Sequence, residues 1–222
     1  MGTKKLIMVG VLLIGFLFSA MDFGYCEEEF PEWVPKEMIE RAQEALVSDK
    51  TSSEFLFDMS NKELSKCTLR YPFKIVRVDY DNYTEGDDIK NYFEELRSSG
   101  NTTYGYGFGL YLDDKRLGTI EIGYNKKGML SIIGSSRIMP EAEDWLAAIY
   151  QKYPSDSGYK IIREVLKPAY FVEKNKEIVQ VMTCSAPEGI RFSNPEKHML
   201  EVKKGLIEGR KKAHLKPHLK NQ

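Results

Sequence analysis

The most constraining feature of this sequence is an alternating run from Tyr104 to Leu112. Aromatic and apolar residues, among them Tyr104, Tyr106 and Phe108, alternate there with three glycines. Successive side chains of a strand point to opposite faces, so the run predicts a strand with one aromatic face and one nearly bare face. A bare face permits a helix to approach closely or the sheet to curve strongly.

Further apolar runs with turn residues between them predict more strands. The runs cover 73–78, 104–112, 117–124, 129–133, 159–166, 169–172 and 177–184. The three from 104 to 133 form a meander. The hairpin at 170–182 echoes the one at 110–122, because each places a charged turn between apolar strands. The echo is too short to establish a repeat.

Helical spacing of apolar residues predicts helices at 35–48, 60–67, 87–97 and 139–153, and another that starts at Asn194 and Pro195. Strands and helices do not alternate regularly along the chain. The sequence therefore predicts an α+β fold. We expect a curved antiparallel sheet of about 5–7 strands, packed by 2–3 helices, with a C-terminal amphipathic helix or tail.

The N-terminus resembles a signal for export. Lys4 and Lys5 precede a small and apolar stretch from Leu6 to Ala20, which is shorter than the roughly 20 residues that span a bilayer. We expect residues 1–26 to be a signal peptide cleaved after Ala20 or Cys26, and the protein to be secreted or extracytoplasmic. An uncleaved membrane anchor is the alternative. Residues 27–193 would then form one domain, and 194–222 a basic helix or tail.

An exported chain meets oxidising conditions, so its cysteines are candidates for a disulfide. Cys67 and Cys184 lie 117 residues apart. Closing so long a loop would stabilise the fold by about 4–5 kcal/mol in the chain-entropy treatment. The alternative is two unrelated buried thiols. Three scattered cysteines without a C-x-x-C motif do not predict a zinc site.

The sequence predicts no catalytic, metal or cofactor site. All three histidines, His198, His214 and His218, lie in the C-terminal segment, and no nucleophile motif or phosphate loop accompanies them. The net charge of −1 gives no general attraction for nucleic acid, so we expect no nucleic-acid partner. We expect a protein without enzymatic activity.

Two surfaces are candidates for binding. The rings of Tyr104, Tyr106 and Phe108 would line a groove for a ligand or peptide, unless they form a core face beneath the 139–153 helix. The C-terminal segment is strongly basic and would contact an anionic membrane or cell-envelope surface, unless it is a solvated terminus. Its candidate contact residues are Lys203, Lys204, Arg210, Lys211 and Lys212.

The leading hypothesis is therefore an exported, non-catalytic domain that binds an extracellular protein or a small ligand. It depends on an export signal, on enough apolar residues for a complete core, and on the lack of a catalytic motif. The alternative is a secreted hydrolase, or an inhibitor or modulator of one, whose site is assembled only in three dimensions.

Overall fold

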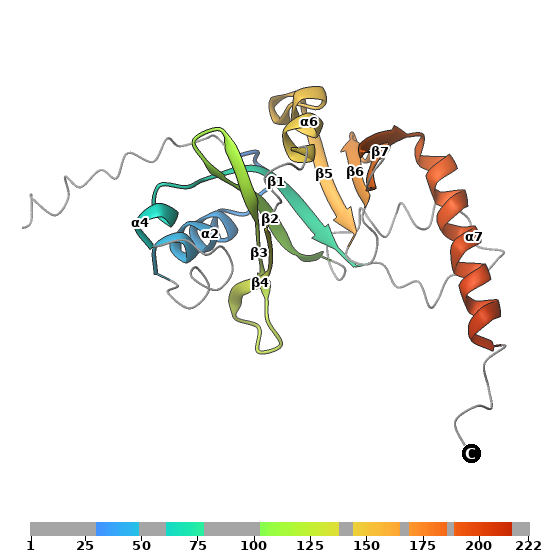
Figure 1. Ribbon diagram of the computed structural model, residues 1–222, viewed down its shortest axis with the longest axis horizontal. Coiled ribbons are helices and arrows are strands. Elements are labelled where there is room, and N and C mark those ends of the chain that lie inside the picture. Colours follow the sequence, from blue (N-terminus) through green and yellow to red (C-terminus); the bar gives the residue numbers. More distant parts are fainter. Residues whose placement is uncertain are drawn as a thin grey trace, which may run out of the picture.

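The structure is a computed structural model that describes residues 30–48, 61–77, 103–137, 144–164, 169–185 and 189–214. It has an α+β fold built on one open eight-stranded sheet in the order β4-β3-β2-β1-β5-β6-β7-β8 (Figure 1). The strands are β1 (Thr68–Val76), β2 (Thr103–Leu112), β3 (Lys115–Tyr124), β4 (Leu130–Arg137), β5 (Tyr159–Glu164), β6 (Ala169–Lys174), β7 (Glu177–Ser185) and β8 (Gly189–Ser193).

Three longer helices pack on this sheet. Two short helical segments lie in the connections that precede β1 and β5. The longer helices are α2 (Lys36–Ser48), α6 (Trp145–Lys152) and α7 (Pro195–His214). The short ones are α4 (Asn61–Leu64) and η2 (Ser155–Ser157). No helix among the described residues is both long and apolar enough to cross a membrane.

The sheet is mixed and larger than the sequence predicts. β1 pairs in parallel with β5, whereas every other neighbouring pair is antiparallel. The expectation of a purely antiparallel sheet is wrong at this one pair, because hairpin signals cannot show that two strands more than 80 residues apart lie side by side. The described residues form eight strands, one more than the upper end of the prediction. The sequence did not indicate β8, because this strand is too short to show a strand pattern.

The parallel pair joins two antiparallel halves, β1–β4 and β5–β8, whose central hairpins match in detail. In the β2–β3 hairpin the register shifts by one residue between Leu110 and Tyr111, and in the β6–β7 hairpin between Val172 and Glu173. The closing pairs, Leu112↔Lys115 and Lys174↔Glu177, differ by the same interval (174 − 112 = 62). The hairpin echo in the sequence thus corresponds to equivalent strands with an equivalent β-bulge.

The helices cover both faces of the sheet. Residues paired in register point to the same face, and Lys74 pairs with Tyr106 on one side and with Ile162 on the other. Tyr106 packs with the cluster under α2, and Ile162 belongs to the cluster under α7. These two helices therefore lie over one face, at the two ends of the sheet. α6 covers the opposite face, where it packs on Phe73 and Ile161.

Two helix predictions need correction. The helix expected at 139–153 corresponds to α6, which begins at Trp145. Asp144 has a non-helical backbone and caps the first turn of α6. The aromatic face of β2 packs under α2 and not under this helix, since Phe108 lies in the cluster with Met38 and Ala42. The helix expected at 87–97 lies outside the described residues.

Candidate functional site

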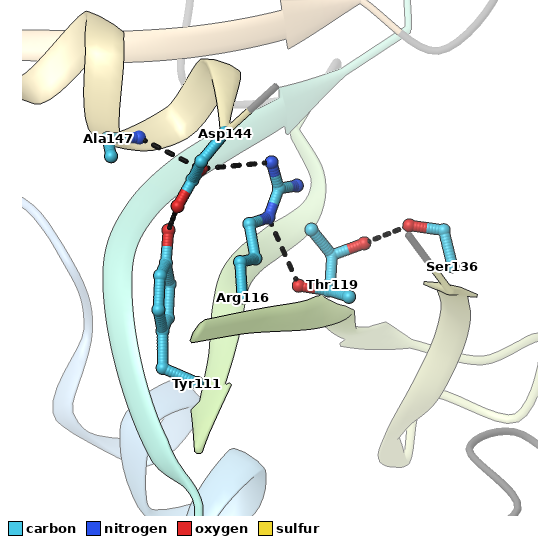
Figure 2. Close-up of polar contacts among 7 residues, drawn as sticks. Tyr111, Arg116, Thr119, Ser136, Asp144 and Ala147 are labelled. Atoms are coloured by element: carbon cyan, nitrogen blue, oxygen red, sulfur yellow. Dashed lines mark hydrogen bonds and ion pairs between the residues drawn. The ribbon is translucent and has the colours of Figure 1, made fainter. Parts of the chain in front are cut away.

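A cluster of polar side chains lies where the N-terminus of α6 meets the β2–β3 hairpin (Figure 2). Asp144 caps α6 by accepting a hydrogen bond from the Ala147 amide at 3.1 Å. The same carboxylate accepts one from the Tyr111 hydroxyl at 2.6 Å and one from Arg116 Nη1 at 3.4 Å. Tyr111 and Arg116 are paired across the hairpin, so the turn of this hairpin delivers both side chains to the helix end.

Arg116 is the most enclosed cation of the cluster. Its side chain is 2% exposed, and its guanidinium lies over the Trp145 ring, 4.0 Å from the centroid. Nε donates to the Gly118 carbonyl, whereas Nη2 has no hydrogen-bond partner. Burial lowers the pKa of Arg116, and the neighbouring Tyr111 and Asp144 offset part of this effect. The pairing with Asp144 therefore limits the cost of an enclosed positive charge.

A second ion pair lies on the same face. Arg163 of β5 donates two hydrogen bonds to the Glu121 carboxylate on β3. Burial alone would lower the pKa of Arg163, but the Glu121 charge raises it above the ordinary value. The Tyr170 ring contacts Trp145 at 4.1 Å between centroids, and burial raises the pKa of its hydroxyl although both arginines act against this. The two ion pairs and the rings form one continuous cluster.

The chemistry of this cluster is that of a clamp. Both carboxylates are occupied by hydrogen bonds from arginines, so neither resembles a general base with a free lone pair directed at a substrate. Burial and the Asp144 charge raise the pKa of Tyr111, which keeps its hydroxyl protonated. No group of three metal-binding side chains occurs in the described part of the chain. The cluster ties the N-terminal end of α6 to the β2–β3 hairpin.

The glycine face of β2 is filled by neighbouring side chains. A Cβ at Gly107 would overlap the ring of Phe73, the residue paired with it on β1. Those at Gly105 and Gly123 would meet the end of the Ile133 side chain. All three glycines are buried, so the predicted bare face holds rings and side chains from adjacent strands and leaves no open groove there.

The three residues predicted to bind a ligand differ in accessibility. Phe108 is completely buried and packs edge-on against Phe30, so its ring is not available to a ligand in this structure. Tyr106 is half-buried and stacks on Trp33 at 6.4 Å between centroids. Tyr104 is 45% exposed. Ligand binding at these residues therefore remains a prediction, and only Tyr104 and the exposed part of Tyr106 are accessible to a ligand.

Tyr104 belongs to a wider exposed surface that sequence reasoning missed. The register pairs Gly105 with Gly123 and Tyr124 with Leu130, so Tyr104 and Tyr124 are neighbours on one face beside the β3–β4 turn. Tyr124 is 57% exposed, and Met129 in that turn is 55% exposed. We call Tyr104, Tyr124 and Met129 the aromatic rim. Its only sequence signal was apolar residues at the ends of neighbouring strands.

The structure does not bring the two candidate disulfide residues together. Cys67 is a free, buried thiol directly before β1, and Cys184 lies on β7. β5 and β6 separate these strands, and three strand spacings amount to about 14 Å, whereas a disulfide requires Cα atoms within about 7 Å. The Cys67 thiol donates to the Glu63 carbonyl instead, and burial raises its pKa to about 11.

The basic residues of the C-terminal segment are helical. Asn194 caps α7 through hydrogen bonds from the amides of Glu196 and Lys197, which confirms the predicted helix start. Lys203 is half-buried and Lys204 is exposed. Arg210, Lys211 and Lys212 continue the helix, and their side chains lie outside the described ones.

Comparison with known proteins adds no relative: no protein-family model, no curated protein and no solved structure matches this chain.

Proposed function

We propose that this protein is an exported, non-catalytic domain that binds another protein or a peptide through the aromatic rim. The observation that carries the proposal is that Tyr104 and Tyr124 are neighbours on one face of the meander, with Met129 in the adjoining β3–β4 turn, and that each of these side chains is about half exposed. Tyr and Met are enriched at protein interfaces, and a tyrosine ring adds a large contact area at a low cost in conformational entropy.

The rim stands on a rigid support. Tyr106, the next residue on the same face of β2, is held against Trp33 before α2. Beneath it Phe108 and Ile122 are completely buried. A surface held in this way loses little flexibility when a partner binds, which favours affinity. The rim therefore has the properties of a preorganised contact surface.

The alternative of a secreted hydrolase has less support. The carboxylates of the α6 cluster bind arginines, and burial raises the pKa of Tyr111 and of Tyr170. Neither arrangement supplies a nucleophile or a poised base. An inhibitor or modulator of a hydrolase would be one kind of protein-binding domain and agrees with the same rim.

The test compares two variants secreted from the protein's own host. The rim variant replaces Tyr104, Tyr124 and Met129 by Ser. The control variant replaces Val47 and Val179, which are also about half exposed but lie outside the rim, by Ser. Chemical crosslinking of the native secretions should yield a covalent complex with the wild-type and control proteins and little with the rim variant. Equal yields from all three proteins would contradict the proposal.

Export is tested separately by the intact mass of the protein recovered from the medium or envelope. A mass that begins after Ala20 or Cys26 supports export with cleavage. A full-length mass found only inside the cell would contradict export and therefore an extracellular partner. The crosslinking test would still decide whether the rim binds another protein.

A further inference from the structure

We propose that α7 is an arm that docks on the surface of an anionic lipid bilayer. This surface is distinct from the aromatic rim, and the proposal goes beyond the protein-binding function. It depends on how α7 is anchored, on how its charges are distributed, and on the face that it leaves uncovered.

The first half of α7 anchors the helix to the sheet. Met199 is buried and Val202 is partly buried in a cluster with Phe171 and Val181 of β6 and β7. His198 adds an edge-on contact with the Phe171 ring at 5.9 Å between centroids. Beyond this contact the helix continues for about three more turns and runs away from the sheet, toward the C-terminus (Figure 1). The anchored half therefore holds the second half out from the domain.

Basic residues are concentrated in that second half. From position 203 to 214 the helix carries five Lys and Arg residues and a single acid, Glu208. The whole chain, by contrast, has a net charge of −1. Anionic lipid headgroups attract basic residues held near a membrane by about 1 kcal/mol each. The local excess of positive charge makes α7 complementary to an anionic surface although the protein as a whole is not.

One face of α7 combines apolar and basic positions. Leu200 is 58% exposed, with Glu196 and Lys197 one turn before it and Lys204 one turn after it, and the basic positions increase toward the C-terminal half of this face. Ile207 and Lys211 follow at the same helical spacing, which places positions 200, 204, 207 and 211 on one face. Interfacial helices have this pattern, because apolar residues enter the lipid boundary while lysines reach the headgroups.

That face is open along the described part of the helix. A shallow hollow of about 400 Å³ lies against it, lined by Asn194, Glu196, Lys197, Leu200, Glu201 and Lys204. A soluble polyanion would need only the charges, whereas the exposed Leu200 between two lysines fits a surface that has both headgroups and hydrocarbon. We therefore assign the face to a lipid bilayer.

The test measures co-sedimentation of the full exported chain with vesicles of phosphatidylcholine, with and without phosphatidylserine. Binding should require phosphatidylserine and should decline as salt rises toward about 1 M. The double variant Lys204→Gln/Lys211→Gln should bind about tenfold more weakly or worse. Leu200→Ser should also weaken binding. All variants share the same N-terminus, so differences among them report on α7 alone.

Matched controls make the result decisive. Lys126→Gln/Lys127→Gln removes the same charge from an exposed turn of the other half, and Val179→Ser removes an exposed apolar side chain outside α7. Both should bind vesicles as the wild type does. Equal binding to vesicles without phosphatidylserine, or equal losses in the control and α7 variants, would overturn the proposal. The proposal would also be overturned if the wild type bound dextran sulfate but not vesicles, and if Leu200→Ser left the binding to dextran sulfate unchanged.

Discussion

The two halves of the sheet share a hairpin and differ in what covers it. The β2–β3 and β6–β7 hairpins have closing pairs and a register shift at equivalent positions. In the first, glycines let neighbouring rings lie against the strand, and Tyr111 and Arg116 reach α6. In the second, Phe171 occupies the position equivalent to Gly109 and packs beside α7. The same backbone thus supports a tightly clamped half and a half that carries a projecting helix.

The difference shows that backbone register and surface function are set by different residues. The turn and bulge positions determine the hairpin, whereas residues between them decide which helix is held and which side chains stay exposed.

The largest effect is expected from the ion pair that clamps α6. Asp144→Ala removes the helix cap and leaves the Arg116 charge enclosed without its partner, which should destabilise the protein by about 3–5 kcal/mol. In the other half, Lys160→Met removes the ion pair between Lys160 and Glu173. Because the Lys160 side chain is 31% exposed, this change should lower the free energy of unfolding by at most about 1 kcal/mol. Urea unfolding measures both. Similar costs would mean that the clamp does not distinguish the halves.

A smaller effect is expected where a glycine accommodates a ring. Gly107→Ala places a methyl group where the Phe73 ring lies and should destabilise the fold by about 1–3 kcal/mol. Ala169, the equivalent residue of the second half, already carries a side chain, and Ala169→Gly should cost only about 0.5–1 kcal/mol. Thermal unfolding of the two variants tests the pair. A neutral Gly107→Ala would show that Phe73 can move aside freely.

Alkaline pH should weaken the clamped half. The pKa of Tyr111 is raised above its unfolded value near 10 by burial and by Asp144, so the folded state retains a proton that the unfolded state loses. This stabilisation is complete below about pH 10 and is lost as pH rises beyond it. Tyr111→Phe should therefore lose less stability between pH 9 and 11 than the wild type does. Parallel slopes in thermal melts would contradict this role of Tyr111.

Cysteine labelling should show no bridge between the halves. Cys67 directly precedes β1, and Cys184 lies on β7, which is separated from β1 by two other strands, so both should react with iodoacetamide in denatured protein that has not been reduced. Peptide mapping locates the label. A Cys67–Cys184 pair protected until reduction would require a different strand order.

The smallest effect on stability is expected at the rim. Tyr124 is more than half exposed, so Tyr124→Ser should change the free energy of unfolding by no more than about 0.5 kcal/mol. A loss comparable to that of Gly107→Ala would show that Tyr124 belongs to the core and not to a contact surface.

Local patterns predicted much of the fold. The alternation at 104–112, the charged turns and the Asn194–Pro195 helix start identified elements that the structure contains. The parallel β1–β5 pair was not visible, because strand order depends on contacts between distant segments. The Asp144–Tyr111–Arg116 cluster was missed for the same reason, since its members lie up to 33 residues apart. The rim was predicted only at Tyr104, because the sequence does not show which residues of the meander the α2 helix covers, and it is the cluster with Met38 and Ala42 that buries Phe108.

The central claim is that the clamped half carries the partner-binding surface. A photoreactive benzoylphenylalanine at position 124 can be compared with the same residue at Val179 of the other half, in protein produced by its own host. We predict a discrete crosslinked complex from position 124 and none of that mass from position 179. The same complex from both positions, or from position 179 alone, would contradict the assignment of the rim.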